Sequence, residues 1–169
     1  MMKRKAGILL PISSLPSRYG IGCFDEAAYK FVDWLQAAGQ HYWQILPLVP
    51  TSYGDSPYQS FSTFAGNPYF ISLDKLVEAG LLTEKEIKVV DMGKKADDID
   101  YAKLYNGRYK LLRKAYEKSR ISENQDFQKY LADNGWWLED YALFMALKDR
   151  FEGKCWNEWP EDIRLRWGY

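Results

Sequence analysis

The chain has 169 residues, and its 23 Lys and Arg residues balance its 23 Asp and Glu residues, so the formal net charge is +0. A compact monomer of this length buries roughly 70% of its unfolded surface, which suffices for one domain, or for one domain and part of another. The balanced charge argues against a nucleic-acid partner, because proteins that bind nucleic acid usually carry a basic surplus. The sequence has no run of about 18 apolar residues, so we expect neither a membrane-spanning helix nor a membrane partner.

The cysteine, histidine and glycine patterns argue against metal, disulfide and dinucleotide sites. Cys23 and Cys155 lie far apart, which fits a reducing, cytoplasmic location and no disulfide framework. The apolar stretch after the basic start is too short for a secretory signal. His41 is the single histidine, neither cysteine has a ligand at zinc spacing, and Gly20 and Gly22 do not complete a GxGxxG motif.

Aromatic residues make up 17% of the chain, with 7 Trp and 13 Tyr. Trp and Tyr suit surfaces that are apolar on one side and wet on the other. Carbohydrate offers such a surface, because a sugar ring presents C–H faces for stacking and hydroxyls for hydrogen bonds. A helical core that is rich in tyrosine explains the same composition, and composition alone favours that explanation.

Two short apolar runs and a helical pattern open the chain. Residues 6–12 predict a strand that is buried on both faces and ends near Pro11, which cannot donate to a central ladder. Apolar residues recur at helical spacing over 24–38, and Gly39 suits the position after the helix end. A second apolar run covers 42–49. This order predicts a βαβ unit with two parallel strands and a right-handed crossover.

The segment 50–69, PTSYGDSPYQSFSTFAGNPY, has neither a helical period nor strand alternation. Unstructured loops of this length in compact domains are usually functional or disordered, and the many rings here argue against disorder. Pro57 restricts Ser56 to extended geometry and fixes the approach of Tyr58. If the two strands belong to a parallel barrel, this loop leaves the strand end where barrel active sites lie. A binding loop and a structural loop whose Asp and Asn cap turns both remain open.

From residue 72 onward the pattern is helical. Capping residues predict helix starts at Ser72, Thr83, Asp100 and Ser122, and apolar spacing predicts helices over 73–79, 101–115, 122–131 and 136–151. We therefore divide the chain into an α/β part, residues 1–70, and a mostly helical part, residues 71–169.

Two strands alone cannot form a doubly covered sheet, and a closed (β/α)8 barrel takes about 250 residues. The sequence therefore predicts the front part of a larger barrel. In that case the strand residues that later strands would cover leave an apolar patch on this chain. These residues are Ile8, Leu9, Leu10, Ile45, Leu46 and Leu48.

The predicted loop carries one carboxylate, Asp55. Cleavage of a glycosidic bond needs two carboxyl groups that flank the bond, and no second candidate lies nearby in the sequence. Glu139 and Asp140 are adjacent on a predicted helix and do not face each other, so we expect them to be solvated or paired with Lys and Arg. If the ligand is a glycan, this chain can bind it but cannot supply the catalytic pair.

Three stretches closely resemble the amino-terminal region of bacterial amylomaltases, which are 4-α-glucanotransferases, or disproportionating enzymes, of the α-amylase clan. They are AGILLPISSLPSRYGIG at 6–22, YWQILPLVPTSYGDSPYQSFSTFAGNPYFISLD at 42–74 and WWLEDYALFMALKDRF at 136–151. The resemblance extends from residue 5 to about residue 166, and residues 88–135 match more loosely.

The resemblance implies the amino-terminal part of a (β/α)8 TIM barrel followed by a helical insertion subdomain. It implies retaining transfer of α-1,4-glucan segments between maltodextrins through a covalent glycosyl-enzyme. The family's catalytic carboxylates lie downstream of this segment, so the partner required is the carboxy-terminal part of the same enzyme. By motif match, Ser56 and Tyr58 line the sugar site with Asp55 beside them, and Tyr53 is a further ring that contacts glucan. No metal or organic cofactor is implied.

Two alternatives to the enzyme segment remain open at this point. The first is a stand-alone, non-catalytic α-glucan-binding module. The second is a helical interaction domain, which rests only on residues 72–169.

Overall fold

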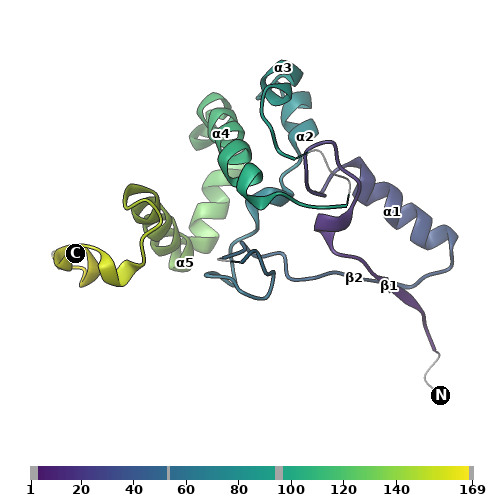
Figure 1. Cartoon of the computed structure of the whole chain (residues 1–169), viewed down its shortest axis with the longest axis horizontal. Coiled ribbons are helices and arrows are strands. Elements are labelled where there is room, and N and C mark those ends of the chain that lie inside the picture. Colours follow the sequence, from purple (N-terminus) through teal and green to yellow (C-terminus); the bar gives the residue numbers. More distant parts are fainter. Residues whose placement is uncertain (1–3, 53, 94–96, 168–169) are drawn as a thin grey trace. The chain divides into compact units, whose positions relative to one another are not determined.

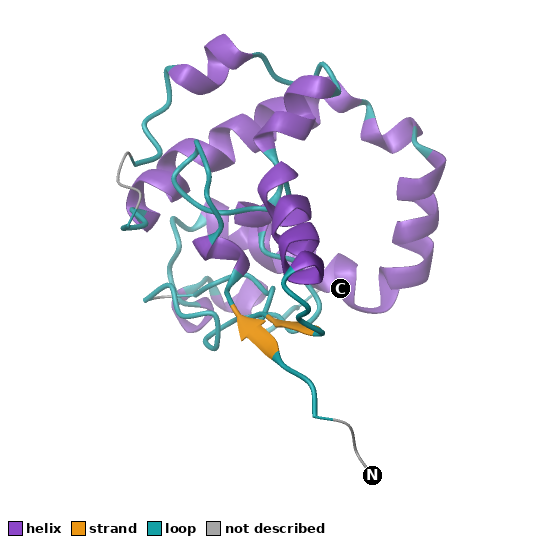
Figure 2. Cartoon of the chain, turned by 90° about the vertical axis from the view of Figure 1, so that its right-hand side faces the viewer, coloured by secondary structure: helices purple, strands orange, loops and turns teal. Residues whose placement is uncertain are grey.

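The structure is a computed structural model that describes residues 4–52, 54–93 and 97–167 (Figure 1). The chain forms two compact units, Met1–Ile121 and Ser122–Tyr169. Most of the regular structure is helical, and the strands lie near the amino terminus (Figure 2). Among the described residues, no helix combines the length and the apolar character needed to cross a bilayer.

The sheet consists of two short parallel strands, β1 (Gly7–Leu9) and β2 (Tyr42–Gln44), in which Ile8 pairs with Trp43. Helix α1 (Glu26–Ala37) lies between them in the sequence. The predicted order of strand, helix and strand and the parallel pairing are therefore confirmed.

Both strands are shorter than the apolar runs that predicted them. Pro11 has no N–H to donate, and directly after it the chain forms the 3-10 helix η1 (Ile12–Ser14). The burial on both faces that residues 6–12 predict is wrong for this chain, because Leu9 is 56% exposed. Of the six strand residues expected to form an apolar patch, Leu9 is exposed and the others are half-buried.

A small apolar core joins α1 to the ends of the strands. Its buried residues are Ile12, Leu15 and Ala28. Trp43 of β2 packs edge-on against Phe31 of α1, with ring centroids 4.8 Å apart. The Trp43 Nε1 donates a hydrogen bond to the Leu10 carbonyl oxygen at 2.8 Å. One indole therefore ties the helix to the carboxyl end of the sheet.

A larger core surrounds helices α2 (Leu73–Glu78), α3 (Glu84–Lys88) and α4 (Tyr101–Ser119). Its buried residues are Tyr19, Ile21, Tyr69, Leu73, Leu82, Ile87, Met92, Leu104, Leu111 and Ala115. Residues from the segment before α1 thus share one core with the helices that follow the loop.

The predicted caps of these helices are confirmed. The side chains of Ser72 and Asp100 accept hydrogen bonds from the backbone N–H three residues later, at 3.2 and 3.0 Å. Thr83 and Glu86 form the predicted capping box. Each cap satisfies N–H groups that the first helical turn leaves unpaired. The predicted division of the chain into residues 1–70 and 71–169 refers to a larger barrel, so it stays a prediction.

The second unit contains α5 (Gln125–Arg150), the 3-10 helix η4 (Trp156–Glu158) and α6 (Glu161–Arg164). The expectation of two helices, 122–131 and 136–151, is wrong, because α5 runs through without a break. The residues between them include a glycine but no proline, and one glycine inside a helix costs only about 1 kcal/mol.

The start of α5 also differs from the expectation. Asn124, and not Ser122, caps the helix, because the Asn124 side chain accepts a hydrogen bond from the Phe127 N–H at 3.0 Å. Ser122 lies inside the preceding 3-10 helix η3 (Ile121–Glu123).

Two glycines before α1 allow backbone segments to approach closely. A Cβ at Gly22 would lie 2.1 Å from the Ile12 carbonyl oxygen and 2.7 Å from the Leu15 nitrogen. Gly20 has φ +78°, and a Cβ there would lie 1.9 Å from the Met92 carbonyl oxygen. Larger residues at either position must push backbone apart, which explains the pair of glycines in the turn.

We predict that Gly22→Ala lowers the free energy of unfolding by about 3 kcal/mol, because the clash is with backbone and not with a flexible side chain. The matched control is Gly66→Ala, where an added Cβ meets no atom of the described residues within 4 Å, and this variant should change stability by less than about 0.5 kcal/mol. Urea denaturation of the chain measures both. Equal midpoints for the two variants would contradict the close-approach argument.

Candidate functional site

The loop between β2 and α2 is closed at its base by backbone hydrogen bonds. The Asn67 N–H donates to the Leu48 carbonyl oxygen at 2.8 Å. The Asn67 side chain is buried and accepts from the Tyr69 N–H at 3.0 Å, which caps the 3-10 helix η2 (Pro68–Phe70). The loop thus leaves the carboxyl end of β2 and returns beside it.

The tip of the loop makes a sharp turn. Gly54 has φ +87° and Asp55 has φ +56°, so two successive residues are left-handed. Aspartate tolerates this conformation better than most side chains. The Asp55 N–H donates to the Ser52 carbonyl oxygen at 3.1 Å, and the Ser52 N–H donates to the Gln59 carbonyl oxygen at 2.9 Å. These bonds fold the tip back on itself.

The turn presents Ser56 and Tyr58. The Ser56 hydroxyl oxygen accepts a hydrogen bond from the Tyr58 N–H at 3.3 Å, and the Ser56 carbonyl accepts from the Gln59 N–H at 3.0 Å. Ser56 is half-buried, whereas the Tyr58 side chain is 75% exposed. The loop therefore holds Tyr58 by its backbone and leaves its ring exposed.

Asp55 lies at the carboxyl end of both strands. It lines a small cavity of about 90 Å³ together with residues that follow β1 and β2, among them Ile12 and Leu46, and with Tyr101 of α4. Burial raises the pKa of the Asp55 carboxyl group above its ordinary value. The pKa of the Tyr101 hydroxyl is also raised, first by burial and then by the negative charge of Asp55. The sequence placed Tyr101 only on an apolar helix face and did not connect it to this loop.

A cluster of tyrosines continues from this point along α4. The ring centroid of Tyr69 lies 6.0 Å from that of Tyr101 and 5.7 Å from that of Tyr109, and Tyr105 lies 5.3 Å from Tyr109. The spacing of 101, 105 and 109 by four residues puts these rings on one side of the helix. That spacing is the signal by which the sequence could have predicted the cluster.

Of the four predicted site residues, Asp55, Ser56 and Tyr58 lie together on this turn, whereas Tyr53 lies outside the described residues. Asp140 is paired with Arg166, as expected for a carboxylate that has no catalytic partner on its helix. Within the described ranges, no three His, Cys, Asp or Glu side chains group in a way that could hold a metal ion. The turn thus brings a ring, a hydroxyl and one carboxyl group together.

We predict that Asp55→Asn flattens the pH dependence of stability. Because burial raises the pKa of Asp55, the folded chain holds this proton more tightly than the unfolded chain, so stability falls as pH rises from about 4 through the raised pKa. Asparagine also tolerates a left-handed backbone, and it carries no charge. The variant should therefore unfold at a higher urea concentration than the wild type at pH 7.

The measurement is urea denaturation at several pH values between 4 and 7. Asp133→Asn, which removes an exposed carboxylate from α5, is the control and should follow the wild type. If the stability of the Asp55→Asn variant changes with pH as steeply as that of the wild type, burial does not disfavour the charge of Asp55.

The sequence profile described as 4-α-glucanotransferase matches residues 10–167 of the chain. The chain is 53% identical to the 4-α-glucanotransferase of Streptococcus pneumoniae over 168 aligned residues. The aligned region covers 98% of this chain and 33% of the relative. It is 45% identical to the 4-α-glucanotransferase of Thermus thermophilus over 169 aligned residues, and this aligned region also covers 98% of this chain and 33% of the relative.

A solved structure, the amylomaltase from Streptococcus agalactiae in complex with acarbose, matches with a TM-score of 0.86 at 39% identity, over 98% of this chain and 34% of its own length. The chain thus spans about a third of the length of the relatives it matches. Because the family profile covers nearly the whole chain, and the loop that carries Asp55, Ser56 and Tyr58 lies inside the matched region, the chain belongs to the 4-α-glucanotransferase family.

Proposed function

We propose that this chain is the amino-terminal part of a 4-α-glucanotransferase that transfers α-1,4-glucan segments between maltodextrins with retention of configuration. The observation that carries the proposal is the family match over residues 10–167 together with the loop at the carboxyl end of β2. The complex of the Streptococcus agalactiae amylomaltase with acarbose, an oligosaccharide analogue, supports a glucan as the substrate class.

In the proposed enzyme, residues 1–70 form the first βαβ unit of a cytoplasmic (β/α)8 barrel, and residues 71–169 form a helical insertion. The remaining strands of the barrel and the catalytic carboxylates come from the rest of the polypeptide. Parallel barrels place their active sites at the carboxyl ends of the strands, which is where Asp55 lies relative to β1 and β2.

This part of the enzyme forms a wall of the sugar site. The exposed ring of Tyr58 packs against the sugar next to the bond that is cleaved, and the Ser56 hydroxyl bonds a sugar hydroxyl. The double displacement needs a nucleophilic carboxylate and an acid/base carboxyl group that flank the bond. Asp55 alone cannot fill both roles, so the loop orients the sugar and does not carry the chemistry.

A stand-alone glucan-binding module is not favoured. The relatives that match nearly all of this chain are enzymes about three times as long, and the match lies within them. A separate module would need no polypeptide beyond its own fold.

A chimera tests the proposal directly. The matching third of the Streptococcus pneumoniae 4-α-glucanotransferase is replaced by this chain, and disproportionation of maltotriose to glucose and longer maltodextrins is measured. We expect an active chimera and no activity from residues 1–169 alone. A folded but inactive chimera, or a fully active isolated chain, would overturn the proposal.

We predict that Tyr58→Ala in the active chimera lowers kcat on maltotriose on the order of 100-fold, because loss of the ring lets the sugar sit about 1 Å out of place. Tyr58→Phe keeps the ring and should lose less. Tyr53→Ala should raise KM more than it lowers kcat, because we expect this ring to contact the glucan further from the cleaved bond.

Tyr116→Ala is the control for Tyr58→Ala, because it removes another exposed tyrosine, 65% exposed, from α4. It should leave kcat unchanged. If Tyr58→Ala has a normal melting temperature and normal turnover, the loop does not form a wall of the sugar site.

A further inference from the structure

The first unit leaves large apolar side chains uncovered on its sheet and on the helix that crosses it. Leu9 of β1, Tyr42 of β2, and Val32 and Trp34 of α1 are between 49% and 59% exposed. Single exposed apolar side chains are common, but these four lie on three elements that follow one another in the chain (Figure 1). We call them the βαβ surface. A group of this kind marks an interaction surface.

Helix α1 is apolar on both sides of the stripe that it buries. Its buried residues are Ala28 and Leu35, and Ala28 belongs to the core that α1 shares with the ends of the strands. At 3.6 residues per turn, Val32 and Trp34 project about 200° apart, one on each side of this stripe. The remaining side of α1 carries the exposed residues Glu26, Lys30 and Asp33. Because a surface helix usually has a single apolar stripe, the two apolar flanks indicate a neighbour on each side.

The sheet is open on one face and at its edges. Ile8 pairs with Trp43, and Trp43 packs against Phe31 of α1. Because side chains alternate along a strand, Leu9 and Tyr42 point to the opposite face. Within the described residues each strand has one neighbour, so its other edge carries backbone groups to which a further strand can bond. Parallel sheets are normally covered on both faces, which this sheet is not.

A groove connects one flank of α1 to β2. Its volume is about 450 Å³, and its lining includes Val32 and Gln36 from the helix and Tyr42 and Trp43 from the strand. Val32 and Tyr42, both of the βαβ surface, therefore belong to one concave surface. A segment that continues the sheet beyond β2 would fill it.

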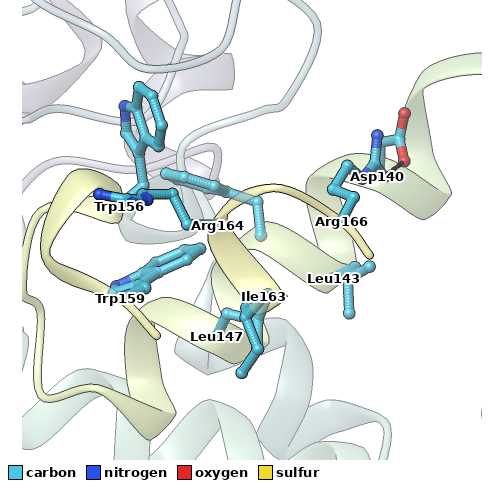
Figure 3. A pocket seen from close by; sticks show the side chains of 9 residues that line it. Asp140, Leu143, Leu147, Trp156, Trp159, Ile163, Arg164 and Arg166 are labelled. Atoms are coloured by element: carbon cyan, nitrogen blue, oxygen red, sulfur yellow. Dashed lines mark hydrogen bonds and ion pairs between the residues drawn. The ribbon is translucent and has the colours of Figure 1, made fainter. Parts of the chain in front are cut away.

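The second unit offers a different kind of surface. Its concavity of about 340 Å³ lies between α5 and the segment that follows it, and Figure 3 shows the Arg164 side chain between the indoles of Trp156 and Trp159. The strands of the described residues, β1 and β2, both belong to the first unit. A partner that adds strands therefore fits the first unit and not this concavity.

The length of the relatives argues what covers the βαβ surface. This chain corresponds to about a third of the 4-α-glucanotransferases and of the amylomaltase that it matches. In the proposed enzyme, the other two thirds supply the remaining strands and helices of a parallel barrel. Such a polypeptide adds strands at the open edges and helices along the flanks of α1, where the apolar side chains are exposed.

We propose that the βαβ surface is the assembly interface for the carboxy-terminal part of the enzyme, and that the two parts stay together without a peptide bond between them. The identity of this partner rests on the proposed function. The first unit already contains two apolar cores of its own, so it does not need the partner's residues to form them. A covalent link then contributes only a high effective concentration, and the apolar interface holds the parts together.

The test cuts the chimera in which this chain replaces the matching third of the Streptococcus pneumoniae 4-α-glucanotransferase. A protease site is placed directly after residue 169, the folded chimera is cleaved, and the products are diluted and run on size-exclusion chromatography. We expect the two pieces to elute together and to keep the disproportionation of maltotriose.

Two variants locate the interface. Val32→Glu and Tyr42→Glu should each weaken the association of the cut pieces about tenfold or more, because a buried charge without a partner is costly. The matched controls are Val89→Glu and Tyr116→Glu, which change a valine that is 83% exposed and a tyrosine that is 65% exposed elsewhere in the first unit. They should leave association unchanged. All four side chains are exposed in the isolated chain, so its melting temperature should change little in every variant.

Four outcomes would overturn the interface. The first two are separation of the cut pieces of the unsubstituted chimera and equal association of the Tyr42→Glu and Tyr116→Glu variants. The third is a dimer of the isolated chain that Tyr42→Glu dissolves, which would assign the surface to a second copy. The fourth is a chimera that does not fold into a single soluble species, because the partner then does not fit this surface.

The uncut chimera reports on the proposed function independently. An active uncut chimera whose pieces separate after cleavage rejects this interface alone. An inactive chimera whose pieces stay together, and separate in the Val32→Glu and Tyr42→Glu variants, rejects only the enzyme assignment.

Discussion

The buried guanidinium of Arg108 is the constraint on which the first unit depends. The side chain is 0% exposed, and its Nη2 donates to the Ile71 carbonyl oxygen at 2.5 Å. Burial lowers its pKa, and the nearby Cys23 thiol and Asp25 carboxylate act in the opposite direction. Because a buried charge is costly without compensating groups, α4, the segment after the loop and the start of α1 must keep their places together.

The loop at the carboxyl end of β2 inherits its geometry from this arrangement. Ile71 directly follows η2, which Asn67 caps while also closing the loop on Leu48. A loop with a fixed base can hold the left-handed Asp55, a conformation that is sparsely populated for residues other than glycine. The base of the loop that carries Tyr58 thus lies next to Ile71, whose carbonyl oxygen accepts from the buried guanidinium.

The loop and the second unit obtain their shapes from different interactions. Backbone hydrogen bonds shape the loop, and its polar groups stand on a turn. The second unit depends instead on side chains: Trp159 contacts the rings of Phe144 and Phe151, and Arg166 pairs with Asp140. No described residue of α5 is buried, so this helix contributes only partly exposed side chains to the packing.

By itself the sequence determined the family, because long stretches of it resemble the family's sequences. It also determined the order of the first strand, helix and strand and the caps at Ser72, Thr83 and Asp100, because caps and periodicity act between residues a few positions apart. It misjudged the burial of the first strand, since burial depends on which segments lie nearby in space. It also misjudged the continuity of α5, since no local signal decides whether one glycine interrupts a helix. Only the tertiary structure decided that Tyr101 lies beside the cavity of Asp55 and that Arg166 pairs with Asp140. Both contacts join residues that are distant in sequence, and they form only when the chain folds back on itself.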